Sequence, residues 1–395
     1  MLFLLRILVG MALVGWLVYT ALEICAATMW KRSGRTVPLE EYCPPVTILK
    51  PVRGVDADAV ENFASFCRLD YPPEAFQIVF GILDEDDPVI PILKTLILQY
   101  PHIDISLVVG GQAAVRGYNR KVCNLVTMLP LVKHPLLALT DSDMRVTPDY
   151  LKKVVIPFKN PDERVGLVTN PYRGMLPDSI VAKFEALGIG ADFIPSSLVS
   201  RMLEGVSFAF GASIVLPKAV LDEIGGFEIL LNELADDYKL AQAVHKAGYV
   251  LEISDCMVDD VMGAESFSAA WARRLRWART IKVSRPGGYA GMLITHGLAL
   301  AILFALITPW KIGLPVFVGT FVIRTIAAVR ISHITHDPNI KRYWFLLPIS
   351  DILSFILYLW SYAGNTVMWR GEKFSLQSGG KLTKKSEPGK EARPS

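Results

Sequence analysis

The sequence lacks the signatures of several common classes of protein. Its 395 residues contain five cysteines, which form no CxxC pair, and no N-x-Ser/Thr sequon occurs. A small, odd and scattered set of cysteines is typical of reduced thiols in a cytosolic compartment. No GxxxxGK followed by Ser or Thr is present, and "GIGADF" (188–193) has a GxG without a third glycine, so P-loop ATPases and dehydrogenases lose support. The net charge of +3 does not suggest a nucleic-acid partner.

Long apolar runs are what the chain has instead. Hydrophobic residues make up 52% of it and charged residues 20%, and the mean hydropathy is +0.36. That hydropathy is too high for an ordinary soluble enzyme, while the charge content is too high for a bundle of membrane helices alone. The composition therefore predicts a protein with a globular part and a membrane-embedded part.

Residues 1–30 are predicted to form a transmembrane helix. The uncharged stretch 7–22, extended by "MLFLL", approaches the ~20 apolar residues that span a bilayer. A cleaved signal peptide is the alternative, with Arg6 as its basic region. Basic residues follow the run closely, among them Lys31 and Arg32, and by the positive-inside rule they hold the downstream domain in the cytoplasm.

Residues 289–370 are predicted to be a second membrane region with two or three spans. Apolar stretches at 290–308 and 312–329 are separated by "TPWKIG", which indicates a hairpin. Residues 343–368 are a third candidate, but Asp351 within them also fits an interfacial segment, so the number of spans stays open. A tail at 371–395, basic and rich in Lys, Ser, Pro and Gly, is expected to be disordered.

Residues 45–265 alternate short apolar runs with helical patterns, which predicts a largely parallel α/β sheet. The candidate strands are 45–52, 76–87, 103–111, 134–144, 165–170 and 249–255. Ligands of open parallel sheets bind beyond the carboxyl ends of the strands. Two of these runs end in acids, at Asp84 and at Asp141–Asp143, so both acid clusters are expected at one edge of the sheet.

Each acid cluster has a structural and a functional interpretation. "DSD" at 141–143 suits a turn or a helix cap, because Asp and Ser favour both. It also suits Mg²⁺ or Mn²⁺, which take one or two carboxylates from protein and complete their shell with substrate phosphates. Asp236 and Asp237 are helix-start acids within a predicted helix at 235–248, where one of them could also serve as a general base.

An amphipathic helix is predicted over residues 266–288. In "WARRLRWAR", Arg273, Arg276 and Trp277 fall at i, i+3 and i+4 and share one face. One interpretation is a basic helix lying on anionic lipid. The other is guanidinium contact with a pyrophosphate leaving group, and different arginines can serve each role. Four further basic residues favour the lipid interpretation: Arg274, Arg279, Lys282 and Arg285.

Taken in order, these motifs resemble the D, D, D, (Q/R)xxRW signature of membrane-bound GT-A glycosyltransferases, and more narrowly the ceramide glucosyltransferase family. The stretches that carry the resemblance are "ILKPVRGVD" (48–56), "LDEDDP" (83–88), "NRKVCNL" (119–125), "TDSDMRV" (140–146), "IGGF" (224–227), "ADDY" (235–238) and "RRLRW" (273–277). The resemblance covers about residues 1–375. It implies a Rossmann-like GT-A domain with a mostly parallel sheet in the cytosol, joined to transmembrane helices.

The resemblance also implies roles for particular residues. Asp84 would contact the uridine of the donor, and Lys121 would lie near the donor. Asp141 and Asp143 would hold the diphosphate and its Mg²⁺ or Mn²⁺, while Asp237 would be the catalytic base. Three residues would close over the diphosphate and the acceptor: Arg273, Arg276 and Trp277.

The function implied is an inverting transfer of glucose from UDP-glucose, or a related UDP-sugar, to a hydroxyl of a ceramide-type lipid in the bilayer. Eukaryotic members often have Gly where Asp143 stands and a His-Pro pair where this chain has "GADFIPSS" (190–197), whereas a bacterial branch that glycosylates hopanoids has "DSD". A hopanoid N-acetylglucosaminyl- or glycosyltransferase is therefore an alternative, as is a processive polysaccharide synthase, which needs more spans. We expect a multi-pass protein of the bacterial inner membrane with a cytoplasmic catalytic domain.

Overall fold

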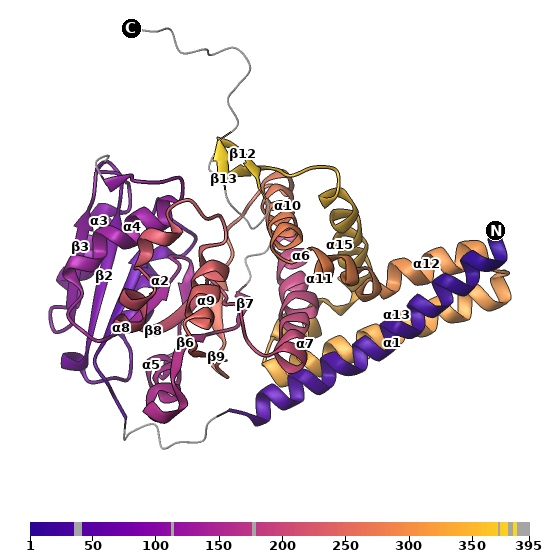
Figure 1. Cartoon of the computed structure of the whole chain (residues 1–395), viewed down its shortest axis with the longest axis horizontal. Coiled ribbons are helices and arrows are strands. Elements are labelled where there is room, and N and C mark those ends of the chain that lie inside the picture. The colour runs from indigo at the N-terminus through magenta and orange to yellow at the C-terminus, as the bar shows by residue number, and fades with distance from the viewer. Residues whose placement is uncertain (35–41, 112–113, 176–178, 370–371, 378–381, 385–395) are drawn as a thin grey trace, which may run out of the picture.

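A computed structural model describes residues 1–34, 42–111, 114–175, 179–369, 372–377 and 382–384 (Figure 1). Its strands are β1 (Val46–Pro51), β2 (Phe76–Ile82), β3 (Asp104–Val109), β4 (Leu136–Thr140), β5 (Met144–Arg145), β6 (Val165–Thr169), β7 (Tyr172–Met175), β8 (Ser213–Pro217), β9 (Val250–Ile253), β10 (Val258–Val261), β11 (Thr366–Trp369), β12 (Glu372–Leu376) and β13 (Leu382–Lys384). Its α-helices are α1 (Leu2–Arg32), α2 (Ala59–Cys67), α3 (Ile90–Gln99), α4 (Arg120–Met128), α5 (Tyr150–Val155), α6 (Ile180–Gly188), α7 (Ile194–Glu204), α8 (Lys218–Glu223), α9 (Asp236–Lys246), α10 (Phe267–Ser284), α11 (Pro286–Gly291), α12 (Gly297–Ile307), α13 (Trp310–Thr335), α14 (Pro338–Tyr343) and α15 (Leu347–Ser361).

The centre of the α/β domain is a seven-stranded sheet in the order β3-β2-β1-β4-β8-β6-β9. All neighbouring strands are parallel except β8, which runs antiparallel to both β4 and β6. Strands β2 and β4 are buried along their whole length, as continuous apolar runs covered on both faces must be. The predicted parallel sheet is present, and β8 is an antiparallel strand that the sequence interpretation did not include.

Helices cover both faces of this sheet. Alternate residues of each strand point to opposite faces, so Ile48 and Phe80 enter one apolar core while Leu49 and Val79 enter the other. The first core is completed by side chains from α2, α3 and α5, and the second by side chains from α4, α8 and α9. The rigid sheet therefore fixes where the strand ends and the first residues of α4 and α9 lie.

Three helices extend away from the domain as a bundle, α1, α12 and α13 (Figure 1). Among the described residues, three helices are long and apolar enough to cross a membrane, 2–32, 310–335 and 338–361, and a bent pair makes a fourth candidate. That pair covers the predicted span 290–308, which breaks at His296 with a bend of 58° between 286–295 and 297–307. The guanidinium of Arg6 donates to the carbonyl of Ile307 at 2.5 Å, so the start of α1 meets the α12–α13 turn.

The last predicted span, 343–368, differs from the structure. Its helix ends at Ser361, and it packs along α10 and α6 as well as against α12 of the three-helix bundle. Asp351, which suggested an interfacial position, is buried and pairs with Arg324 of α13 at 3.0 Å. That pairing satisfies the carboxylate inside protein, so Asp351 by itself gives no information about the depth of α15.

The expectation of a disordered tail at 371–395 is wrong for part of it. Strands β11, β12 and β13 form an antiparallel three-stranded sheet. Its contacts lie with α10 and with the α/β domain, far away in sequence, and a local composition rule does not detect such contacts. Residues 385–395 lie outside the described part of the chain.

Candidate active site

The carboxyl end of β4 carries the "DSD" stretch. The strand ends because the chain turns there: the amide of Asp141 donates to the carbonyl of Ala212 at 3.3 Å, and the amide of Met144 donates to the carbonyl of Asp141. Ser142 donates its hydroxyl to Asp56 at 2.5 Å, which joins this turn to the loop after β1. The loops that follow the neighbouring strands β1 and β4 therefore meet at the carboxyl ends of the strands, through a residue, Asp56, that the sequence interpretation did not single out.

Lys121 connects this strand end to the start of α9. Its ammonium lies 2.5 Å from Asp141 and 3.8 Å from Asp236. Helix α4 presents it there because the side chain of Asn119 caps the helix, accepting from the amide of Val122 at 3.2 Å. Burial opposes the charge on Lys121, but the carboxylates of Asp141 and Asp236 raise its pKa above the ordinary value.

The two acids of "ADDY" have different surroundings. Asp236 accepts a hydrogen bond from the amide side chain of Asn119 at 3.2 Å in addition to its contact with Lys121. Asp237 accepts from the amide of Tyr238 at 2.7 Å through Oδ1. In the described part of the chain no hydrogen bond reaches its Oδ2, which a Cβ at Gly211 would approach to 3.1 Å. Burial and the nearby charge of Asp236 raise the pKa of Asp237 to about 6.

Asp143 is the most charge-crowded member of the site. Burial and the carboxylates of Asp141 and Asp56 raise its pKa to about 7, and its buried Oδ1 has no hydrogen-bond partner among the described residues. Asp260 on β10 adds another acid, whose pKa is raised well above its usual value by burial and Asp143. An unpaired buried carboxylate oxygen among acids suits a hard divalent cation.

That cation would depend on substrate oxygens as well as protein. No group of three His, Cys, Asp or Glu residues able to hold a metal ion occurs within the described residues. Mg²⁺ and Mn²⁺ commonly use one or two carboxylates together with phosphate oxygens, so two aspartates suffice. The residues present therefore fit a metal that Asp141 and Asp143 would hold together with phosphate oxygens of a substrate.

Lys50 is a site residue that the sequence interpretation missed. It is completely buried in β1, and its ammonium donates to Thr140 Oγ1 at 3.1 Å and to the carbonyl of Asp141 at 2.8 Å. Its ammonium also lies 3.8 Å from the centroid of the Phe66 ring. Burial lowers the pKa of Lys50 to about 7. A lysine inside the apolar run "VTILKPV" was the signal that could have identified it.

The predicted site residues of helix α10 differ in their surroundings. The guanidinium of Arg273 is held by Glu185 of α6 and by Glu265, and it lies 5.7 Å from the Trp277 ring. Arg276 makes no ion pair within the described residues. Burial and Arg273 lower its pKa, and the charges of Asp236 and Asp237 act against that shift. The charges of the α9 acids thus act on Arg276, whereas Arg273 is held by Glu185 and Glu265.

Four basic residues that we expected to favour a lipid surface have protein partners instead. Arg274 donates to Ser354 at 2.9 Å, and Lys282 donates to the carbonyl of Ser361 at 2.7 Å. The other two act similarly: Arg279 donates to the carbonyl of Thr366 and Arg285 contacts Glu204. These contacts dock α10 onto protein, and its placement at a lipid surface stays a prediction.

Asp84 lies apart from the other acids. It follows β2 at the same edge of the sheet and is exposed, and no hydrogen bond or ion pair joins it to Asp141, Asp143 or Asp237 among the described residues. Its neighbour Asp87 is buried and accepts from the amide of Gly54, so Asp87 braces the loop after β1. One oxygen of Asp84 accepts from the amide of Asp86 at 3.2 Å, and the uridine contact of Asp84 stays a prediction.

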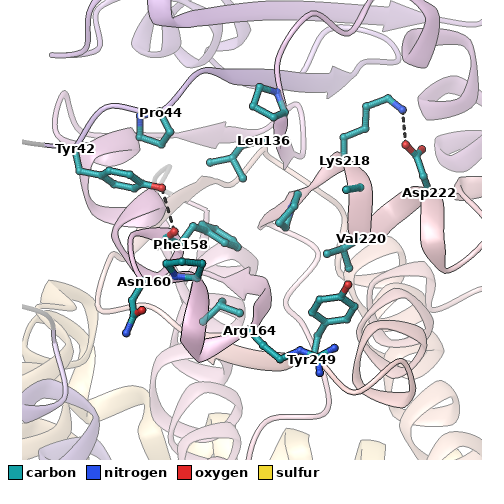
Figure 2. Close-up of a pocket in the computed structure, with 15 residues that line it drawn as sticks. Tyr42, Pro44, Leu136, Phe158, Asn160, Arg164, Lys218, Val220, Asp222 and Tyr249 are labelled. Atoms are coloured by element: carbon teal, nitrogen blue, oxygen red, sulfur yellow. Dashed lines mark hydrogen bonds and ion pairs between the residues drawn. The ribbon is translucent and has the colours of Figure 1, made fainter.

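A cavity of about 670 Å³ lies at the other end of the strands from the acids, near the start of β4 (Figure 2). Leu136 lines it at the start of β4, whereas Asp141 follows the end of that strand, about 13–17 Å away. Lys218 in its wall is paired with Asp222 at 2.6 Å, and Tyr42 donates to the carbonyl of Phe158 at 3.1 Å. This cavity contains none of the acids or arginines described above.

The fold resembles that of a solved structure. The fold matches a mannosyltransferase from Pyrobaculum calidifontis in complex with GDP-Man and Mn²⁺, with a TM-score of 0.53, 20% identity, and coverage of 91% of this chain and 99% of that one. The predicted α/β domain of GT-A type with membrane helices is confirmed. At this identity the likeness shows the fold alone.

The sequence profile of glycosyl transferase family 21 matches residues 7–382, so the chain is a glycosyltransferase and belongs to this family. Two similar relatives are ceramide glucosyltransferases 1 and 3 of Caenorhabditis elegans, 24% and 27% identical, which cover 86% and 60% of this chain. The matches span 73% and 50% of those relatives' own lengths. The Candida albicans ceramide glucosyltransferase is 32% identical over 30% of this chain and 23% of its own length. The predicted resemblance to the ceramide glucosyltransferase family is confirmed.

Proposed function

We propose that the chain transfers glucose from UDP-glucose, with inversion, to a hydroxyl of a ceramide-type membrane lipid. The observation that carries this proposal is the environment of Asp237. Its Oδ2 is free of hydrogen bonds within the described residues, its pKa is raised to about 6, and the charges of Lys121 and Asp141 act on it. A carboxylate with a pKa near the working pH can accept a proton and still be ionised at neutral pH.

The proposed step is a single displacement. The lipid hydroxyl gives its proton to Asp237 as its oxygen forms a bond to C1 of the sugar. The bond between C1 and the diphosphate oxygen breaks, and UDP leaves with that electron pair. Asp236 is less suited to the role, because Asn119 and Lys121 already engage its carboxylate.

Cationic groups stabilise the charge that develops on the diphosphate. Lys121 is held at the end of β4 by Asp141, and Arg276 of α10 is within electrostatic reach of Asp236 and Asp237. Their contribution is large only if they are positioned before the bond breaks, which their anchoring in α4 and α10 provides. Mg²⁺ or Mn²⁺ held by Asp141 and Asp143 would neutralise part of the same charge.

The membrane helices support a lipid acceptor. The three-helix bundle of α1, α12 and α13 anchors the domain, and Trp30 near the end of α1 donates its indole N–H to the carbonyl of Ser254 at 3.0 Å. The C-terminal sheet β11–β13 contacts the α/β domain, so both lie on one side of the membrane in this proposal. Crossings by α1, by the bent pair that contains α12, and by α13 satisfy that condition and place Lys31 and Arg32 in the cytoplasm.

Donor and acceptor are tested directly in the first experiment. The full-length protein in membranes is incubated with several UDP-sugars and a total lipid extract, and the new glycolipid is identified by its mass. Glucosylceramide supports the proposal. A glycosylated hopanoid would favour the alternative suggested by Asp143, and a polymer would identify a processive synthase.

The role of the base is tested by Asp237→Asn. This change removes the proton acceptor while keeping the size of the side chain, so we expect the rate to fall by about 10²–10⁴-fold. The matched control is Asp222→Asn, which removes an exposed carboxylate paired with Lys218 at 2.6 Å. Full sugar transfer by Asp237→Asn in membranes would disprove the mechanism, whichever lipid is used.

A further inference from the structure

The small sheet that follows the last helix is the feature with the least obvious purpose. Strand β12 pairs antiparallel with β11 and with β13. Figure 1 shows it beyond the end of α10, between the α/β domain and the membrane helices. Three of its side chains point into a common apolar cluster and are each 3% exposed: Val367, Phe374 and Leu376. We refer to these three residues as the clasp.

The clasp packs against two loops of the α/β domain. The ring of Phe374 meets the ring of Tyr118 edge-on, with 5.7 Å between their centroids. Leu234, which is 5% exposed, packs in the same cluster. Tyr118 and Leu234 come from chain segments more than a hundred residues apart, and both precede helices that carry site residues.

The same sheet is also fastened to helix α10. Val283 of α10 packs against the clasp. The guanidinium of Arg279 donates to the carbonyl of Thr366 in β11, and Lys282 donates to the carbonyl of Gly364 at 3.3 Å. Arg276 lies one helical turn before Arg279, so these hydrogen bonds are close to the site.

The residues that the clasp contacts lie close in sequence to groups of the proposed active site. Tyr118 lies three residues before Lys121, and its amide donates to the side chain of Asn232 at 3.2 Å. Leu234 lies two residues before Asp236 and three before Asp237. The clasp therefore touches three segments: the residues before α4, the residues before α9, and helix α10. These segments carry the cations and the base of the proposed site.

We propose that the clasp is a positioning element that holds the starts of α4 and α9 in register with α10. It rests on the proposed function, because it acts through Lys121, Asp237 and Arg276. The clasp itself does not touch the substrate. Since catalysis by prepositioned charges fails when the charges shift by about 1 Å, loss of the clasp lowers turnover even in a protein that still folds and inserts.

The test uses Phe374→Ala in the full-length protein in membranes. We expect kcat/KM for the UDP-sugar to fall about 10-fold, corresponding to ~1.4 kcal/mol of lost transition-state stabilisation. Phe374→Leu keeps most of the apolar contact and should recover most of the rate. The matched control is Met368→Ala in the same sheet, because Met368 is 51% exposed and is expected to leave kcat/KM unchanged.

A double-mutant cycle separates positioning from general destabilisation. Tyr118→Ala should reduce kcat/KM by a similar factor, and the pair Tyr118→Ala with Phe374→Ala should cost clearly less than the product of the two, because both remove one contact. Additive losses, or a Phe374→Ala protein as active as Met368→Ala, would overturn the proposal. If Asp237→Asn stays fully active, the proposed function is wrong. If Asp237→Asn is inactive and Phe374→Ala stays fully active, only the proposed role of the clasp is wrong.

Discussion

The surroundings of Asp237 predict how activity depends on pH. Its pKa is raised to about 6 by burial and by the charge of Asp236, and the ammonium of Lys121 opposes that shift. A carboxylate with that pKa is ~90% ionised at pH 7 and only ~9% ionised at pH 5. Because the ionised form is the base, kcat/KM should fall about tenfold between pH 7 and pH 5, with a midpoint near 6.

Two substitutions should move that midpoint in opposite directions. Lys121→Gln removes a cation that stabilises ionised Asp237, so the acid limb should move up by about one unit. Asp236→Asn removes a like charge, so the limb should move down by about one unit. Both variants will be slower than the parent protein. The quantity compared is therefore the pH at which kcat/KM falls to half, and not the maximal kcat/KM.

The assay is transfer of radiolabelled sugar to lipid by the protein in membranes, at a fixed free concentration of Mn²⁺ and from pH 4.5 to 8. Asp222→Asn serves as the control, because its exposed carboxylate should leave the midpoint where it is. The reasoning is refuted if the acid limb has a midpoint near 4, the value of an ordinary aspartate. It is equally refuted if the two substitutions move the midpoint in the same direction.

Two further predictions follow from the same region. EDTA should abolish sugar transfer and Mn²⁺ or Mg²⁺ should restore it, while Asp143→Asn should raise the metal concentration needed for half-maximal rate; full activity in EDTA would show that no metal is used. Lys50→Met should lower the free energy of unfolding by about 1–3 kcal/mol, because Thr140 and the carbonyl of Asp141 lose a buried donor, and an unchanged thermal midpoint in detergent would contradict this.

The strands that lead to the site could be predicted because their patterns are local. The apolar run that becomes β4 ends where Asp141 begins, and β2 ends shortly before Asp84. Strands β8 and β10 were missed for physical reasons. β8 is an antiparallel insertion between parallel strands, and β10 contains Asp259 and Asp260 in succession, which hides its alternation.

The side-chain partners within the site could be predicted less well. The motif placed Arg273 at the diphosphate, but its partners in the structure are Glu185 and Glu265, which lie 88 and 8 residues away in sequence. Lys50 drew no prediction, since a lysine in a strand is ordinarily a surface residue. Such pairings depend on which elements pack together, and no short window of sequence contains that information.

The clasp has a consequence for the order in which the enzyme becomes active. Translation runs from the amino terminus, and domains begin to fold before the chain is finished. A nascent chain that ends at residue 365 already carries Asp141, Asp237 and Arg276 but not Phe374. The clasp is made only after α12, α13 and α15, so under this proposal the chain reaches its full rate of sugar transfer only once its membrane region has been synthesised.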